Sequence, residues 1–299
     1  SQFYKSKWGT KVFKIPVALA GSCPNVKADG LKPCIFCDEW GSFAYPQNQK
    51  ESLQEQIRLH KEKVGKRYNS DHFFVYFQAY TTTYTQVQRV REAFETALQT
   101  PGVVGLVIGT RPDCLSPALI DTFNAVAEKS FMAVELGVQS FDDRQLQWMR
   151  RGHDSDQAKK GIQRIKSQCP QVNLGIHLMF GWPGESLEDV RRSAQVCNQL
   201  QVDNVKLHNL HVLKKTELEN LYQKNQFTPV DFNQYAALVA EFLSHLSPEI
   251  AIHRLVATAS RWEELVSPQW TRHKMQNFQG MVTYLREKQI YQGMHYEPL

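Results

Sequence analysis

Short apolar runs alternate with longer amphipathic segments along the first two thirds of the chain. The short runs are rich in Val, Ile, Phe and Tyr, which is typical of β-strands. They occupy residues 14–21, 72–78, 103–109, 131–138, 172–181 and 202–210. Helical periodicity predicts helices between them, at about 50–66, 85–99, 116–129, 142–150, 154–168 and 186–200. Strands that alternate with helices in this way imply a parallel sheet built from βαβ units.

The faces of the predicted strands distinguish an open, doubly wound sheet from a partial barrel. A parallel sheet covered by helices on both faces has almost entirely apolar strands. Here the strands alternate: in the run at 172–181, Ile176 and Leu178 share one face, and Gly175 and His177 share the other. We therefore predict an α/β fold, a partial (β/α)6 TIM-like barrel, with its core at about residues 12–214.

Residues 215–299 do not continue the alternation of strands and helices that is predicted for the core. Helices are predicted at about 215–225 and 231–246, followed by a short strand at 249–257. No Pro- or Gly-rich linker separates this segment from the rest. We expect a C-terminal α+β extension that packs on the barrel, within a single domain spanning residues 1–299.

Polar side chains gather on the strand faces that point away from the predicted helices. In a barrel these groups line the interior, and active sites lie at the C-terminal ends of the strands. The set comprises Tyr76, Gln78, Glu135, Gln139, His177, Lys206 and His208. Internal ion pairs, such as one between Glu135 and Lys206, are the alternative, although buried charges are costly and rarely cluster without function. Arg111 and Asp113 either line the same mouth or pair with each other.

Three cysteines lie close together directly after the first predicted strand. The segment SCPNVKADGLKPCIFC places Cys23, Cys34 and Cys37 in one loop, with the spacing C-x10-C-x2-C. Structural zinc normally has four protein ligands, whereas a [4Fe–4S] cluster held by three thiolates leaves one iron open. An iron–sulfur cluster is favoured, with zinc (completed by Asp38 or a distant His) and plain thiols as alternatives.

Composition excludes several classes of protein. The chain has 299 residues, is 42% hydrophobic and carries a formal charge of +5, so it can form a full core and is not intrinsically disordered. No apolar run reaches the roughly 18 residues of a membrane helix. The basic start and IPVALAG before Cys23 resemble a lipoprotein signal, but the apolar part is short and contains Pro16. We expect a cytoplasmic protein whose cysteines are thiols or ligands.

A cysteine loop after the first strand of a six-stranded barrel resembles the radical S-adenosylmethionine (SAM) superfamily, in which an aromatic residue such as Phe36 precedes the last cysteine. The longer first interval is similar to the Elongator catalytic-subunit branch and the YhcC-like family. Resemblance to the YhcC-like family runs nearly end to end. The motifs that carry it are SCPN, YFQAYT, GTRPDC, ELGVQSFDD, RRGHD, HLMFGWPGE, KLHNLH and HRLVATAS.

This resemblance implies a [4Fe–4S] cluster on Cys23, Cys34 and Cys37, and a SAM molecule that chelates the open iron and is reductively cleaved to a 5′-deoxyadenosyl radical. Phe36 would pack near the adenine, and Gln78 with the backbone of Ala79 would hold the SAM amino group. By similarity to coproporphyrinogen-oxidase-type enzymes, the remaining SAM contacts would come from Gln139, Arg151 and His177. Catalytic roles on the substrate or SAM side would fall to Lys206, His208 and Glu135.

The substrate is indicated only by charge and by the resemblance. Residues 1–28 contain five lysines and no acid, and residues 144–166 contain seven Lys or Arg against Asp154 and Asp156. These are either solvated faces or a footprint for RNA phosphates. The resemblance implies modification of a wobble-uridine C5 side chain in tRNA, with a flavodoxin- or ferredoxin-type electron donor. Radical chemistry on a small molecule or peptide, and a non-enzymatic iron–sulfur or zinc protein that binds RNA, are the alternatives.

Overall fold

The computed structural model describes residues 7–19, 23–27, 33–41, 48–259 and 261–298. The chain divides into two compact units. The first unit comprises Ser1–Leu31, Trp40–Gly137 and Gln163–Leu174, and the second comprises Lys32–Glu39, Val138–Ile162 and Gly175–Leu299. Ser22 of the SCPN motif and the end of the first predicted strand, residues 20–21, lie outside the described residues.

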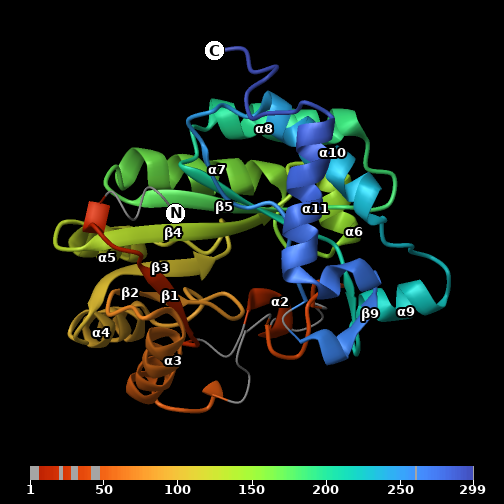
Figure 1. Cartoon of the computed structure of the whole chain (residues 1–299). Helices are drawn as coiled ribbons and strands as arrows, with labels where there is room; N and C mark the ends of the chain where they lie inside the picture. Colours follow the sequence, from red (N-terminus) through yellow and green to blue (C-terminus); the bar gives the residue numbers. More distant parts are fainter. Residues whose placement is uncertain (1–6, 20–22, 28–32, 42–47, 260, 299) are drawn as a thin grey trace. The chain divides into compact units, whose positions relative to one another are not determined.

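Seven strands form one sheet in the order β1-β2-β3-β4-β5-β6-β8, and Figure 1 labels β1 to β5 of this sheet. The strands are β1 (Phe13–Val17), β2 (Phe73–Phe77), β3 (Val103–Thr110), β4 (Phe131–Gln139), β5 (Asn173–Phe180), β6 (Asn204–Asn209) and β8 (Ala251–Arg254). Parallel pairing joins β1 to β2, β2 to β3 and β3 to β4 in the first unit, and β5 to β6 and β6 to β8 in the second. All six strands predicted for the core are present, and the strand predicted in the extension becomes the seventh.

The helices between these strands also follow the sequence prediction. They are α3 (Leu53–Tyr68), α4 (Val87–Leu98), α5 (Pro117–Ala127), α6 (Asp143–Trp148), α7 (Ser155–Gln168) and α8 (Leu187–Gln199). Ser116 caps α5 and Ser186 forms a capping box with Asp189 at the start of α8, so the backbone N–H groups of the first turns are satisfied locally. None of the helices in the described residues is long and apolar enough to cross a membrane.

The core of the first unit fills both faces of β2. Phe77 packs against Phe94 of α4, with ring centroids 5.2 Å apart, so its face is the one that the helices cover. On the opposite face Phe74 is fully buried with Val107 and Ala133, and the ring of Trp8 meets Phe74 edge-on. Sequence alternation predicts Phe74 and Tyr76 on this face, and the structure packs both of them among apolar neighbours there. Apolar side chains therefore fill the N-terminal end of this face of β2.

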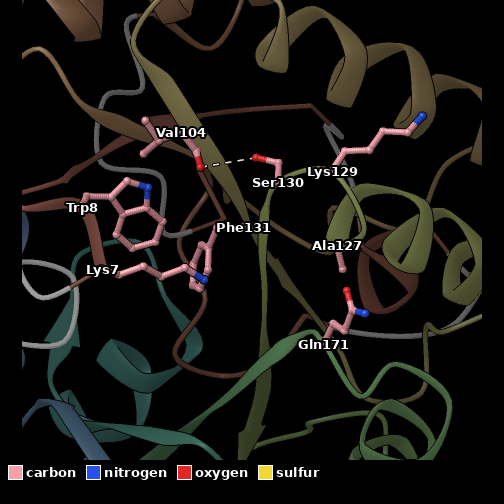
Figure 2. Close-up of a pocket in the computed structure, with 8 residues that line it drawn as sticks. All are labelled: Lys7, Trp8, Val104, Ala127, Lys129, Ser130, Phe131 and Gln171. Atoms are coloured by element: carbon pink, nitrogen blue, oxygen red, sulfur yellow. Dashed lines mark hydrogen bonds between the residues drawn. The ribbon is translucent and has the colours of Figure 1, made fainter.

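A cavity of about 450 Å³ opens in the first unit at the N-terminal ends of β3 and β4. Figure 2 shows its lining, in which the Ser130 hydroxyl donates a hydrogen bond of 3.3 Å to the Val104 carbonyl. The lining residues are Lys7, Trp8, Val104, Ala127, Lys129, Ser130, Phe131 and Gln171. This cavity lies at the opposite end of β3 from Thr110, so it is distinct from the mouth at which the sequence predicts the site.

The second unit contains the C-terminal extension. Its helix α10 (Phe232–His245) packs on α8, and Phe242 meets Phe180 of β5 with ring centroids 5.4 Å apart. Helix α9 (Glu217–Gln223) matches the prediction, and a small antiparallel sheet joins β7 (Val212–Leu213) to β9 (Leu265–Ser267). The sequence analysis missed this small sheet and helix α11 (Lys274–Glu287), as well as the short helices α2 (Pro24–Lys27), η2 (Trp262–Glu264) and η3 (Gln269–Arg272).

Candidate functional site

In the first unit, Cys23 is held next to an arginine that follows β3. Cys23 directly precedes α2, and Nη1 of Arg111 donates to Asn25 Oδ1 in α2 and lies 3.9 Å from Cys23 Sγ. The same guanidinium forms a two-pronged pair with Asp113, with Nε–Oδ1 2.8 Å and Nη2–Oδ2 2.6 Å. Of the two possibilities left open by the sequence, the pair between Arg111 and Asp113 is present. Its guanidinium also contacts the first cysteine.

The Arg111 guanidinium is charged although its side chain is only 3% exposed. Burial lowers the pKa of Arg111, but the hydrogen bonds and charge of Asp113 outweigh burial and hold that pKa above its ordinary value. Thiolate is the form of cysteine that binds metals. A fixed positive charge is therefore in place beside a candidate ligand.

Two further candidate residues belong to the first unit: Gln78 follows the C-terminal end of β2, and Glu135 lies on β4. Glu135, whose side chain is 2% exposed, accepts a hydrogen bond of 2.5 Å from Lys14 Nζ of β1. Gln78 follows β2, and its backbone N–H donates to Val17. Ala79 and Tyr80 then adopt left-handed φ values of 81° and 51°, which non-glycine residues adopt rarely and mostly at functional or turn positions.

Close packing fixes this left-handed turn. Gly41 lies against it, because a Cβ at that position would come within 2.6 Å of the Tyr80 ring. The backbone N–H of Tyr80 donates to the Gly41 carbonyl. The backbone of Ala79, predicted to contact SAM, is thus held in a strained and specific conformation.

In the second unit, Cys34 and Cys37 sit on a turn that backbone hydrogen bonds hold. The Cys37 N–H donates to the Cys34 carbonyl at 3.0 Å, the Ile35 N–H donates to Met149 at 3.1 Å, and the Ile35 carbonyl accepts from Leu218 at 2.8 Å. The Ile35 side chain is buried in an apolar cluster, and Phe36 packs against the same cluster. Arg151 Nη1 lies 3.6 Å from Cys34 Sγ. Cys34 therefore also has a buried arginine as its neighbour.

Gln139 carries the features expected of a ligand-binding residue. It ends β4 with a left-handed φ of 71°. Its side-chain oxygen is buried and has no hydrogen-bond partner within the described part of the chain. Buried polar atoms are nearly always satisfied. A bound molecule that offers an N–H or O–H group would satisfy this oxygen, which fits the predicted role of Gln139 in holding SAM.

Positively charged and histidine side chains gather on β5, β6 and β8 of the second unit. His177 pairs in register with Lys206, and Lys206 pairs with Arg254. The rings of His177 and His208 have centroids 5.1 Å apart, and Arg254 Nη2 contacts both ring nitrogens of His208. We call His177, Lys206, His208 and Arg254 the cationic cluster.

His208 is neutral inside the cationic cluster. Burial lowers its pKa well below the ordinary value, and the charges of Arg254 and its other cationic neighbours lower that pKa further. The sequence analysis missed Arg254, although it lies in the motif HRLVATAS. Arg254 joins the cluster because it lies in register with Lys206, and this register is known only from the pairing of β6 with β8.

Asp38, considered above as a fourth zinc ligand, is bound elsewhere. Its carboxylate accepts a hydrogen bond from the Arg261 guanidinium, and the two side chains are 4% and 14% exposed. Arg261 also pairs with Glu264 at 2.9 Å. The second unit thus neutralises this buried carboxylate within its own fold.

The donor set suits an iron–sulfur cluster. All six cysteines lie in the described residues, and none of them forms a disulfide there. Cys23 belongs to the first unit, and Cys34 and Cys37 belong to the second. Among the residues that the structure describes, no three His, Cys, Asp or Glu side chains form a finished metal site. The fit rests on the chemistry of the donors: two of the three thiols have buried arginines beside them, and a neighbouring positive charge favours an anionic sulfur ligand.

Comparison with known proteins agrees with this chemistry. The profile described as "Radical SAM superfamily" matches residues 31–197, and the "Radical_SAM C-terminal domain" matches residues 202–287. This chain is a member of the radical SAM superfamily. Members of this superfamily use a [4Fe–4S] cluster and SAM, so the predicted cofactors are confirmed.

Two relatives match this radical SAM protein along nearly its whole length. Protein MJ0486 of Methanocaldococcus jannaschii is 34% identical over 98% of this chain and 90% of its own length. YhcC of Escherichia coli is 30% identical over 94% of this chain and 89% of its own length, which confirms the resemblance to the YhcC-like family. A partial match, 33% identical, joins 42% of this chain to 23% of a tRNA uridine(34) acetyltransferase of Methanocaldococcus infernus.

The fold is shared with a solved structure of Elp3 from Methanocaldococcus infernus. The TM-score is 0.65 at 19% identity, over 94% of this chain and 65% of the Elp3 chain. Together with the parallel strand order, this likeness confirms the predicted partial-barrel α/β fold class.

Proposed function

We propose that this radical SAM protein modifies the C5 side chain of a wobble uridine in tRNA. The observation that carries the proposal is the cationic cluster on β5, β6 and β8, where two basic side chains, Lys206 and Arg254, lie beside a neutral histidine. Guanidinium and ammonium groups bind carboxylates through charge-assisted hydrogen bonds, and a uridine side chain that ends in a carboxylate offers such a group. The partial likeness to a tRNA uridine(34) acetyltransferase supports the choice of tRNA.

The proposed roles of the binding residues follow from their positions. Cys23, Cys34 and Cys37 would hold the cluster, and its fourth iron would bind SAM. The buried, unsatisfied oxygen of Gln139 would accept a hydrogen bond from SAM. The other SAM contacts are assigned to Phe36, Gln78, Arg151 and His177. The chemistry that a bound cluster and SAM would supply is the one-electron reductive cleavage of SAM that is general to the superfamily, with a substrate hydrogen atom as its target.

The residues of the cationic cluster would position the substrate. Lys206 and Arg254 would bind its carboxylate, and Arg254 would keep the imidazole of His208 oriented by donating to it. A neutral His208 can exchange a hydrogen bond with the substrate without adding a further charge to the cluster. Glu135, paired with Lys14, is assigned to the substrate side in the first unit. A flavodoxin- or ferredoxin-type protein would supply the electron.

The first experiment measures SAM cleavage. The chain is purified and reconstituted without oxygen and supplied with SAM and dithionite, and 5′-deoxyadenosine is quantified by mass spectrometry. Cys34→Ala is expected to abolish the product. Cys169→Ala is the matched control: this thiol is buried, burial raises its pKa to about 11, and its loss should leave product formation unchanged. Equal product from Cys34→Ala and wild type would contradict the assignment of the cluster ligands.

The second experiment tests the substrate. Nucleosides of tRNA from a deletion strain are compared with wild type by mass spectrometry, and one modified wobble uridine is expected to be replaced by its precursor. Binding of tRNA to the purified chain should weaken steeply as salt rises, because phosphate contacts release counterions. Unchanged uridine modifications in the deletion strain would overturn the tRNA proposal. Salt-independent binding of a small molecule or peptide would favour the alternative substrate class.

A further inference from the structure

The arginine that follows β3 is more tightly fixed than an ion pair alone requires. Arg111 is bound through three nitrogens, with Nε and Nη2 on Asp113 and Nη1 on Asn25. Nη1 also lies 3.9 Å from Cys23 Sγ. All of these residues belong to the first unit. The guanidinium therefore cannot rotate away from the sulfur without breaking its other hydrogen bonds.

A cation and an N–H donor beside a ligand sulfur change the energetics of an iron–sulfur cluster. Reduction adds a negative charge to a cluster that three thiolates already make anionic. A neighbouring positive charge and a hydrogen bond to sulfur stabilise the reduced form more than the oxidised form, so they raise the reduction potential. Because Arg111 is buried, water screens its charge little.

We propose that Arg111 is a positioning residue that sets the reduction potential of the cluster through Cys23. The inference rests on the proposed role of Cys23 as a cluster ligand, and it does not depend on the substrate being tRNA. Asp113 orients the guanidinium, and Asn25 joins it to α2, the helix that begins next to Cys23. The driving force for electron transfer to the cluster then depends on Arg111, the residue that follows β3.

A purely structural role for Arg111 makes a different prediction. If the side chain only fastened α2 to β3, its replacement would lower iron content or stability, and any cluster that still formed would keep its potential. Arg164 allows this distinction. It is another arginine of the first unit, and it donates to the Leu115 carbonyl at 2.6 Å rather than to a cysteine.

The test is a redox titration of the reconstituted chain, in which electron paramagnetic resonance follows the reduced cluster. Arg111→Gln removes the charge and should shift the midpoint to a more negative potential by at least about 59 mV, which is a tenfold change in a one-electron equilibrium. Arg111→Lys keeps the charge and should shift the midpoint less, in the same direction. Arg164→Gln should leave the midpoint at the wild-type value. Iron and sulfide are measured in each variant.

Each result supports or overturns the inference. A wild-type midpoint in Arg111→Gln with full iron content overturns it. If Arg111→Gln fails to hold iron, Arg111→Lys decides: a negative shift supports the inference, and a wild-type midpoint shows a structural role only and overturns it. Wild-type protein that cannot assemble a cluster overturns both the role of Cys23 and the inference. A clear midpoint shift in a chain that does not act on tRNA leaves the inference standing and contradicts only the proposed substrate.

Discussion

The two units hold their candidate cluster ligands by different physical means. In the first unit, Cys23 lies against a network of charged and polar side chains centred on Arg111. In the second unit, the turn that carries Cys34 and Cys37 is held by backbone hydrogen bonds and by the burial of Ile35. Hydrogen bonds add little net stability, whereas apolar burial adds much. Changes to the side chains around Cys23 should therefore alter the properties of the cluster more than the stability of the protein, whereas changes to the turn of Cys34 and Cys37 should alter both.

The largest effect is expected from Ile35→Ala. Ile35 is 1% exposed and lies between the two cysteines of the turn. Truncation of a buried isoleucine costs about 2–5 kcal/mol of unfolding free energy. Urea denaturation should show this loss, and iron content should fall with it because the turn loses its anchor. Ile176→Ala, at a fully buried position of β5, is the control that should lose similar stability but retain iron. Equal iron content in both variants would contradict an apolar anchor for the turn.

A smaller loss of unfolding free energy is expected when Gln56 of the first unit no longer hydrogen-bonds the backbone at the end of β1. The side-chain oxygen of Gln56 accepts from the Ala18 N–H at 2.8 Å, and its nitrogen donates to the Ala18 carbonyl at 3.2 Å. Gln56→Ala leaves both buried backbone groups without this partner, and each unsatisfied group costs about 1–3 kcal/mol. We expect an unfolding free energy lower by about 2–4 kcal/mol, measured in urea. Gln88→Ala, in an exposed pair on α4, should change it by less than about 0.5 kcal/mol.

Local patterns explain what the sequence could predict. Strands and helices follow from the spacing of apolar residues, and the starts of α5 and α8 follow from Ser116 and Ser186, because each cap is complete within four residues. The spacing of Cys34 and Cys37 is equally local. These features need no knowledge of which distant segments meet.

Long-range pairing explains what the sequence could not predict. Arg254 reaches His208 only because β8 pairs with β6, and Lys14 meets Glu135 across 121 residues. Gln56 appears at a polar position of a helix, and only the structure shows that it is buried against β1. Alternation places Phe74 on the same face as Tyr76, and only the structure shows that it packs there against Val107 and Ala133 of the neighbouring strands.

The stability of the protein should depend on pH because one buried carboxyl group in the second unit has a raised pKa. Burial, helped by the charge of Asp189, raises the pKa of Glu185 to about 8, and its Oε2 accepts from the Gly181 N–H at 2.5 Å. Between about pH 4.5 and 8 the unfolded chain loses this proton and the folded chain keeps it, so stability falls as pH rises. Glu185→Gln keeps the hydrogen bond and removes this loss.

Urea denaturation at pH 5 and pH 8 measures the difference in unfolding free energy between wild type and Glu185→Gln. At pH 8 we expect Glu185→Gln to gain at least about 1.4 kcal/mol over wild type, the free energy of a tenfold change in an acid constant, and to gain less at pH 5. Glu188→Gln, at a neighbouring exposed position, is the control. Parallel pH profiles of wild type and Glu185→Gln would show that this carboxyl is ionised in the folded protein.

The smallest effect is expected from Lys215→Met. Lys215 Nζ lies 3.2 Å from Glu39 Oε1, two residues beyond Cys37, but the two side chains are 77% and 52% exposed. Exposed ion pairs contribute about 0–1 kcal/mol. Lys215→Met should therefore change stability no more than Lys160→Met, in an exposed pair on α7, and both should retain full iron content and SAM cleavage. Loss of iron in Lys215→Met alone would break the comparison between the units, because the cysteine turn of the second unit would then depend on a polar contact, as Cys23 does in the first.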